Sequence, residues 1–119
     1  MSSLHHDTGK KGETMASDYL QQHGFIVQHC NWRYSHYEID IIATQNNVLH
    51  FIEVKTRRSL QFGHPEESIS KKKMLSLMNG ARAFQRAHPG WKRIQFDVLS
   101  ITLLPGQPPE FFLIEDVYL

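Results

Sequence analysis

The stretch NNVLHFIEVKTRRS, residues 46–59, begins like an ordinary buried strand and then departs from that pattern. The segment from Val48 to Val54 is mostly apolar, but Glu53 and Lys55 add two full charges at its end. Alternate residues of a strand point to the same face, so both charges are expected on one side of the sheet. The segment therefore predicts a strand that carries a polar cluster on an otherwise buried surface.

The residues before this strand predict its partner. Asparagine tolerates positive φ, so the Asn-Asn pair at 46–47 suits a two-residue turn between antiparallel strands. Counting outward from this turn places Asp40 opposite Glu53 and Glu38 opposite Lys55, all on one face. The alignment depends on the turn, because a three-residue turn without a bulge would break it. The other face is expected to form core from Ile39, Ile41, Ala43, His50, Ile52 and Val54.

Two carboxylates directly opposed on neighbouring strands, roughly 5 Å apart at Cβ, repel one another. A hard divalent cation such as Mg²⁺ offsets this repulsion, since it binds one or two carboxylates together with waters and phosphate oxygens. Lys55 could then hold or polarise a water, or neutralise charge on a phosphate. The alternative is that Glu38–Lys55 and Glu53–Lys55 are strand-end ion pairs of little energetic weight. Spacing alone does not separate the two interpretations.

The rest of the chain predicts an α/β domain with helices flanking a central mixed five-stranded sheet. Helices are expected over residues 12–23 and from about Glu66 to Ala87, with Ser70 a candidate cap slightly inside the second. The element order is αβββαβ with a final strand, and the second helix permits a parallel join that a hairpin cannot make. Strands are expected at residues 25–33, 38–44, 48–55, 93–101 and 110–119.

Composition indicates a single domain over residues 1–119, with residues 1–9 expected to be flexible. The apolar fraction of 40% and the charged fraction of 21% are typical of a soluble globular protein. Cys30 is the single cysteine, which excludes an internal disulfide and suits a reducing compartment. Neither a membrane-spanning apolar run nor a signal peptide is evident, so we expect a cytoplasmic protein with no membrane contact.

Basic residues flank the Glu53 strand, although the formal net charge of the chain is only +1. Such local basicity suits polyanion binding, and it is equally typical of a solvated loop and helix start. Phosphate contacts read charge and not base edges, so weak sequence preference is expected. The candidate nucleic-acid-binding residues are Arg33, Arg57, Arg58, Lys71, Lys72 and Lys73.

Asp40, then Glu53-Val54-Lys55 on the next strand, with Glu13 on a preceding helix, resembles the PD-(D/E)xK nuclease superfamily. Within it the chain is similar to the YraN family, small bacterial proteins related in pattern to archaeal Holliday junction resolvases. The resemblance runs from about Gly9 to the C-terminus. The stretches that carry it are GKKGETMASDYL, NWRYSHYEIDIIA, FIEVKTRRSLQFGHPEE and QFDVLSI.

The resemblance implies a restriction-endonuclease-like fold and a metal-dependent endonuclease acting on DNA, with branched or otherwise structured DNA as the expected form. It implies Mg²⁺ or Mn²⁺ as the cofactor, and a homodimer is compatible with it. The metal ligands would be Asp40, Glu53 and the Val54 carbonyl. The catalytic residues would be Lys55, with Glu13 and, from the strand alignment, Glu38.

A function from another class stays open, namely a nucleic-acid-binding or scaffold protein that keeps the nuclease fold without efficient hydrolysis. The intact acidic positions and Lys55 favour the enzyme. Tyr37 stands where the family usually has glycine, and its bulk is expected to narrow substrate access. His36 shares strand parity with Glu38, but we favour a surface histidine. Asp97 lies within an alternating apolar strand, and we expect it to be structural.

Overall fold

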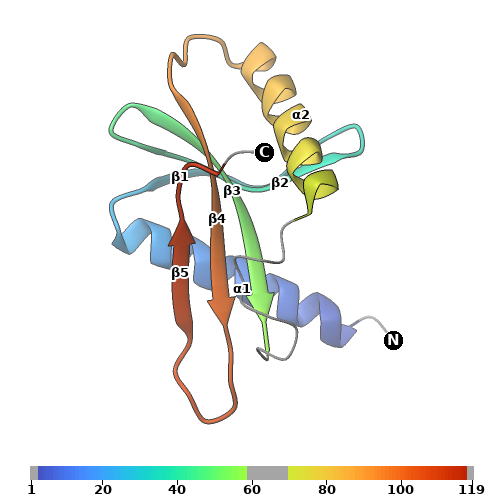
Figure 1. The fold of residues 1–119 in the computed structure, drawn as a ribbon, viewed down its shortest axis with the longest axis vertical. Helices are drawn as coiled ribbons and strands as arrows, with labels where there is room; N and C mark the ends of the chain where they lie inside the picture. Colours follow the sequence, from blue (N-terminus) through green and yellow to red (C-terminus); the bar gives the residue numbers. More distant parts are fainter. Residues whose placement is uncertain (1–2, 59–69, 118–119) are drawn as a thin grey trace.

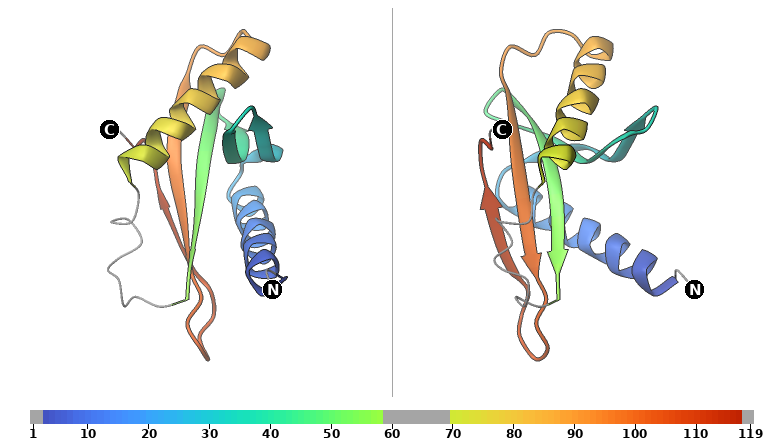
Figure 2. Two further views of the ribbon diagram at one scale, coloured as in Figure 1. Left: turned by 90° about the vertical axis from the view of Figure 1, so that its right-hand side faces the viewer. Right: turned by 45° about the vertical axis from the view of Figure 1, so that its right-hand side comes forward.

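The computed structural model describes the backbone of residues 3–58 and 70–117, with side chains from residue 12 onward. It contains a five-stranded sheet with one helix packed on each face (Figures 1 and 2). The elements in chain order are α1 (Ser3–Gln22), β1 (Ile26–Tyr34), β2 (Tyr37–Gln45), β3 (Val48–Arg57), α2 (Lys71–Ala87), β4 (Ile94–Thr102) and β5 (Glu110–Ile114).

The strands lie in the spatial order β1-β2-β3-β4-β5. β1, β2 and β3 form an antiparallel meander, β3 and β4 are parallel, and β5 returns antiparallel to β4. The parallel pair is made by the long connection that contains α2, which crosses from the end of β3 to the start of β4 (Figure 1). The predicted mixed sheet is confirmed.

The turn between β2 and β3 has the predicted form. Asn46 and Asn47 both have positive φ, 52° and 64°, and Gln45 pairs with Val48 across them. The ladder continues in this register as far as the pair Ile41 and Ile52. The register that brings the acidic residues together therefore follows from a turn of only two residues.

One residue of β2 faces the other way from the prediction. Ile39 was expected beside Ile41, but it packs with the core residues of α2. The close approach of Gly80 permits this, since a Cβ there would lie 3.2 Å from Ile39 Cγ1. Asn31 of β1 lies between Cys30 and Trp32, the partners of Ile41 and Ile39, and its positive φ of 56° makes the ladder irregular at this point. Strict alternation therefore fails at this end of β2.

Both helices begin at residues other than those predicted. α2 starts at Lys71, because Ser70 has extended dihedral angles and its side chain accepts a hydrogen bond from the backbone N–H of Lys73 at 3.1 Å. Residues 66–69, which were expected to be helical, lie outside the described residues. α1 starts at Ser3, so the helix includes most of the segment expected to be flexible. No helix in the described ranges is long and apolar enough to cross a membrane.

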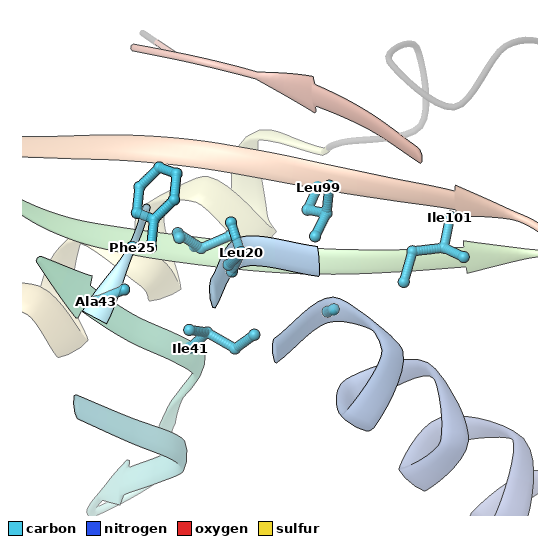
Figure 3. Packing of buried hydrophobic residues seen from close by; sticks show 8 residues of the cluster. Leu20, Phe25, Ile41, Ala43, Leu99 and Ile101 are labelled. Atoms are coloured by element: carbon cyan, nitrogen blue, oxygen red, sulfur yellow. The ribbon is translucent and has the colours of Figure 1, made fainter. Parts of the chain in front are cut away.

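The core consists of two layers, one on each side of the sheet. Leu20 of α1 packs on the first face together with Leu99 and Ile101 of β4 (Figure 3). Phe84 of α2 packs on the second face, where it meets the ring of Phe51 edge-on at a centroid distance of 5.9 Å. We call these sides the α1 face and the α2 face. The sheet therefore lies between the core cluster that contains α1 residues and the one that contains α2 residues.

Gly12 explains why α1 can lie so close to β3. A Cβ at this position would lie 2.5 Å from Thr56 Oγ1, which no real contact shows. We expect Gly12→Ala to lower the free energy of unfolding by about 1 kcal/mol, measured by urea denaturation. In a Thr56→Ala background the same change should be neutral or stabilising, because alanine favours the helix over glycine by about 1 kcal/mol. An equal penalty in both backgrounds would contradict the close-contact explanation.

Candidate functional site

The α2 face carries a pocket of about 340 Å³ at the end of the sheet where β2 and β3 meet the start of α2. Asp40 and Glu53, predicted to oppose one another, both line it. The two carboxylates therefore share one face, although the ladder between β2 and β3 ends one pair earlier, at Ile41 and Ile52. The described lining consists of His36, Glu38, Asp40, Glu53, Ser70, Lys72, Lys73 and Ser76.

Asp40 is held by the backbone of the neighbouring strand. The Val54 N–H donates a hydrogen bond to Asp40 Oδ2 at 2.8 Å, which fixes the carboxylate beside β3. Burial and the negative charge of Glu53 raise the pKa of Asp40 to about 7, and the Val54 hydrogen bond opposes only part of this shift. The site thus has more negative charge than its surroundings neutralise.

Glu53 has a cation beside it that comes from another element. Lys73 Nζ of α2 lies 2.8 Å from Glu53 Oε1, and the Glu53 side chain is only 5% exposed. The distance is that of a charge-assisted hydrogen bond between an ammonium and a carboxylate. Contact with Glu53 raises the pKa of Lys73 despite the opposing effect of burial. Lys73, which was predicted to bind phosphate, therefore serves first as the counter-ion of the acidic pair.

The rim of the pocket carries a weaker pair. Arg33 Nη2 lies 3.0 Å from Glu38 Oε2, and the side chains are 74% and 43% exposed. Exposed pairs of this kind contribute little to stability, and water can replace either partner. Glu38 therefore lies at the pocket, while Arg33 can turn toward a ligand at small cost.

Two predicted catalytic residues lie elsewhere. Lys55 is half-buried on β3, aligned with Ser100 of β4, and is not among the described lining residues. Glu13 belongs to α1 and accepts a hydrogen bond from Asn31 Nδ2 at 2.7 Å. It is likewise absent from the described lining of the pocket. The catalytic roles of Lys55 and Glu13 stay predictions.

The predicted phosphate-binding residues are divided in the same way. Lys72 and Lys73 line the pocket, and Lys71 is exposed at the first residue of α2. Arg57 ends β3 and Arg58 follows it. The basic residues of α2 therefore border the acidic pair directly.

Three other lining residues, His36, Ser70 and Ser76, have a weaker signal in the sequence. His36 is exposed, as expected of a surface histidine, and it also lines the pocket. Ser70 and Ser76 add hydroxyl groups from the start of α2. The cap position of Ser70 was a signal that it lies at a helix N-terminus, where anions bind favourably.

A second polar cluster is buried on the α1 face. His50 Nδ1 lies 2.6 Å from Asp97 Oδ2, and Asp97 is fully buried. Asp97 Oδ1 also accepts hydrogen bonds from Gln95 Nε2 and from the backbone N–H of Asp116, both at 2.9 Å. These contacts join β3 and β4 to the segment after β5. Asp97 therefore has the partners of a structural residue, as expected.

The donor set of the pocket suits magnesium or manganese better than zinc. Asp40 and Glu53 supply two carboxylates, and Mg²⁺ commonly uses one or two together with waters and substrate phosphates. No cluster of three or more histidine, cysteine, aspartate or glutamate side chains suitable for a metal occurs among the described residues. The raised pKa of Asp40 indicates a charge imbalance that a cation would relieve.

Residues 12–101 match the model of the uncharacterised protein family UPF0102. The chain belongs to this family. A UPF0102 protein of Chlorobium phaeobacteroides is 44% identical over 103 residues, covering 85% of this chain and 80% of the relative. One from Bacteroides thetaiotaomicron is 36% identical over 97 residues, covering 82% of this chain and 80% of the relative. The predicted membership of this family, the YraN family, is confirmed.

The fold also resembles a solved structure. Hjc, a Holliday junction resolvase from Archaeoglobus fulgidus, matches with a TM-score of 0.51 and 22% sequence identity. The match covers 87% of this chain and 74% of the resolvase. The predicted restriction-endonuclease-like fold is confirmed by this likeness.

The raised pKa of Asp40 predicts how stability depends on pH. Between its ordinary value of 3.8 and about 7 the folded protein binds more protons than the unfolded chain, so wild-type stability should fall as pH rises through this window. Asp40→Asn removes the ionisation and still offers an oxygen to the Val54 N–H. Without metal, the variant should gain stability over wild type from pH 4 to pH 8, on the order of 1 kcal/mol per pKa unit.

Urea denaturation in EDTA at several pH values measures this effect. Glu110→Gln, at an exposed position on β5, is the control and should follow the wild-type profile. A constant difference between Asp40→Asn and wild type across this range would contradict the assignment of the shift to Asp40.

Proposed function

We propose that this UPF0102 protein is a metal-dependent endonuclease that hydrolyses phosphodiester bonds in DNA, with branched or otherwise structured DNA as substrate. The observation that carries the proposal is the pair of carboxylates, Asp40 and Glu53, on one face beside the lysines at the start of α2. The likeness of the fold to a Holliday junction resolvase supports it. Each hydrolysed phosphodiester bond would consume one water and leave two fragments, one ending in a phosphate and the other in a hydroxyl group.

The acidic pair would hold the metal. Asp40 and Glu53 supply carboxylate oxygens, and the Val54 carbonyl is the proposed third ligand. The Val54 N–H already holds the Asp40 carboxylate beside the Val54 backbone, so the two proposed ligands lie on neighbouring strands at the same point. When bound, Mg²⁺ or Mn²⁺ would neutralise phosphate charge and lower the pKa of a coordinated water.

The start of α2 would hold the phosphate. Ser70 and Lys72 line the pocket, and the N-terminus of the 17-residue helix favours an anion through its aligned peptide dipoles. Lys73 would move its charge from Glu53 to the phosphate once a metal neutralises the carboxylates. Lys55 is proposed to orient the attacking water from β3.

The ion pair between Lys73 and Glu53 favours a second candidate, a DNA-binding protein without hydrolysis. An ammonium that already neutralises Glu53 competes with a metal for the same oxygen. Under this alternative the protein binds DNA, and wild type binds divalent ions no more tightly than the Asp40→Asn and Glu53→Gln variants do. Metal affinity therefore separates the two candidates.

Removal of either acidic charge should abolish both metal binding and cleavage. We expect Asp40→Asn and Glu53→Gln to lower the cleavage rate by about a hundredfold or more. Isothermal titration with Mn²⁺ measures binding. Cleavage is measured on linear, nicked, flapped and four-way DNA and on RNA, with Mg²⁺ or Mn²⁺.

Glu110→Gln is the matched control, since it removes an exposed carboxylate on β5 and should change neither property. Metal binding that persists in both site variants would leave Asp40 and Glu53 as residues of an ordinary ion-pair network. Binding of DNA by wild type without cleavage of any substrate would favour the second candidate.

Lys73 and Lys55 should respond differently to neutralisation. Lys73→Met removes the cation that competes with metal, so Mn²⁺ should bind about fivefold more tightly, as expected for one nearby charge in a partly hydrated site. Lys73→Arg keeps the charge and should retain wild-type affinity. Lys55→Met should leave Mn²⁺ affinity unchanged and reduce cleavage. Titration with Mn²⁺ and cleavage assays test the Lys73 and Lys55 variants. Equal Mn²⁺ affinity in wild type and Lys73→Met would refute the role of Lys73 as the counter-ion of Glu53.

A further inference from the structure

The turn between β1 and β2 carries an unusual number of aromatic rings for its size. Tyr34 pairs directly with Tyr37 across a connection of only Ser35 and His36. Trp32 lies two residues before Tyr34 on the same strand face. Two-residue hairpin turns favour glycine, asparagine and aspartate, and contiguous exposed apolar patches, unlike single exposed side chains, mark interaction surfaces. We call these four residues, Trp32, Tyr34, His36 and Tyr37, the aromatic hairpin.

The rings of this hairpin are anchored in the core. Trp32 meets Phe84 of α2 edge-on, with centroids 5.3 Å apart. Tyr34 is nearly parallel to Trp32, with an interplanar angle of 9° and a centroid distance of 6.3 Å. The contacts run outward from a buried ring to Tyr34, which is 55% exposed. Tyr34 is therefore a supported ring that still presents much of its surface to solvent.

The hairpin also borders the acidic pocket. His36 is one of the pocket's lining residues, and its ring lies 4.2 Å from that of Tyr37. Arg33, between Trp32 and Tyr34 in sequence, pairs with Glu38 at the rim. The hairpin extends from the sheet beside α2 (Figures 1 and 2). Aromatic rings, an arginine and the proposed phosphate site thus adjoin one another.

We propose that the aromatic hairpin binds an unpaired nucleobase of the DNA whose phosphate lies in the pocket. This inference rests on the proposed function and narrows its substrate class to DNA with a single-stranded segment or an opened base pair. Bases inside a duplex are covered by their neighbours, so only an unpaired base offers its face to Tyr34. Stacking on a protein ring accepts every base, which agrees with the weak sequence preference expected of phosphate contacts.

Binding of three matched DNAs tests this proposal. They are a blunt duplex, the same duplex with a single-stranded extension at each end, and the extended duplex with abasic nucleotides in the extensions. Fluorescence anisotropy in EDTA measures affinity without cleavage. Wild type should bind the extended duplex about tenfold more tightly than its abasic counterpart, the size expected for one stacked base. Tyr34→Ala should lose this preference, and Tyr34→Phe should keep it.

Phe112→Ala provides the matched control. Phe112 is 54% exposed, close to the value for Tyr34, but it lies on β5 at the opposite edge of the sheet. This variant should keep the wild-type preference. Equal wild-type affinity for normal and abasic extensions would overturn the proposal, as would equal weakening of all three DNAs by Tyr34→Ala. Binding to none of them would remove the proposed function as well, so the two failures are distinguishable.

Discussion

The two-residue turn at Asn46 and Asn47 sets the register of β2 against β3, and most of the site depends on it. A shift of one residue would move every side chain of one strand to the opposite face. The acidic residues would then meet the apolar layer under α1, and the core residues would face the pocket. Both asparagines adopt positive φ, which few other residues accept at small cost. The chemistry of the pocket thus rests on backbone geometry at the far end of the hairpin.

The acidic pair in turn constrains α2. Burial, together with the negative charge of Glu53 on the same face, raises the pKa of Asp40, and the start of α2 brings Lys73 against Glu53. The capping interaction of Ser70 fixes where the helix begins and therefore which residue reaches that carboxylate. A helix begun one turn earlier would present different side chains to the pocket. The cap and the ion pair act together to position the basic residues.

Features that depend on local sequence were predictable, whereas features that depend on how elements dock were not. The hairpin register, the shared face of Asp40 and Glu53, and the parallel join through α2 follow from turn chemistry and strand alternation. Lys73 could not be assigned to Glu53, because the contact depends on the angle at which α2 crosses the sheet. Three consecutive lysines, 71–73, offer similar local signals. Only the folded arrangement selects one of them.

At two positions the structure differs from the sequence-based prediction for the same physical reason. Gly12 is the first residue of the helix expected from the sequence, yet it lies inside α1, where the helix meets Thr56. Alternation places Ile39 on the α1 face, but α2 approaches β2 closely at Gly80 and Ile39 packs with the core residues of α2. In both cases a packing contact between distant segments outweighed a correct local preference.

The irregularity of β1 also affects how the molecule meets other chains. β1 is a nine-residue strand at the edge of the sheet, and such an edge offers unpaired N–H and C=O groups to any extended segment in solution. The bulge between Val27 and His29 interrupts this row, and Asn31 interrupts it again with a φ of 56°. A strand from another chain could pair with only short segments of β1 before the hydrogen-bonding register was lost. Irregular edges of this kind are a known means by which natural sheets limit edge-to-edge pairing, and β1 has two such irregularities within nine residues.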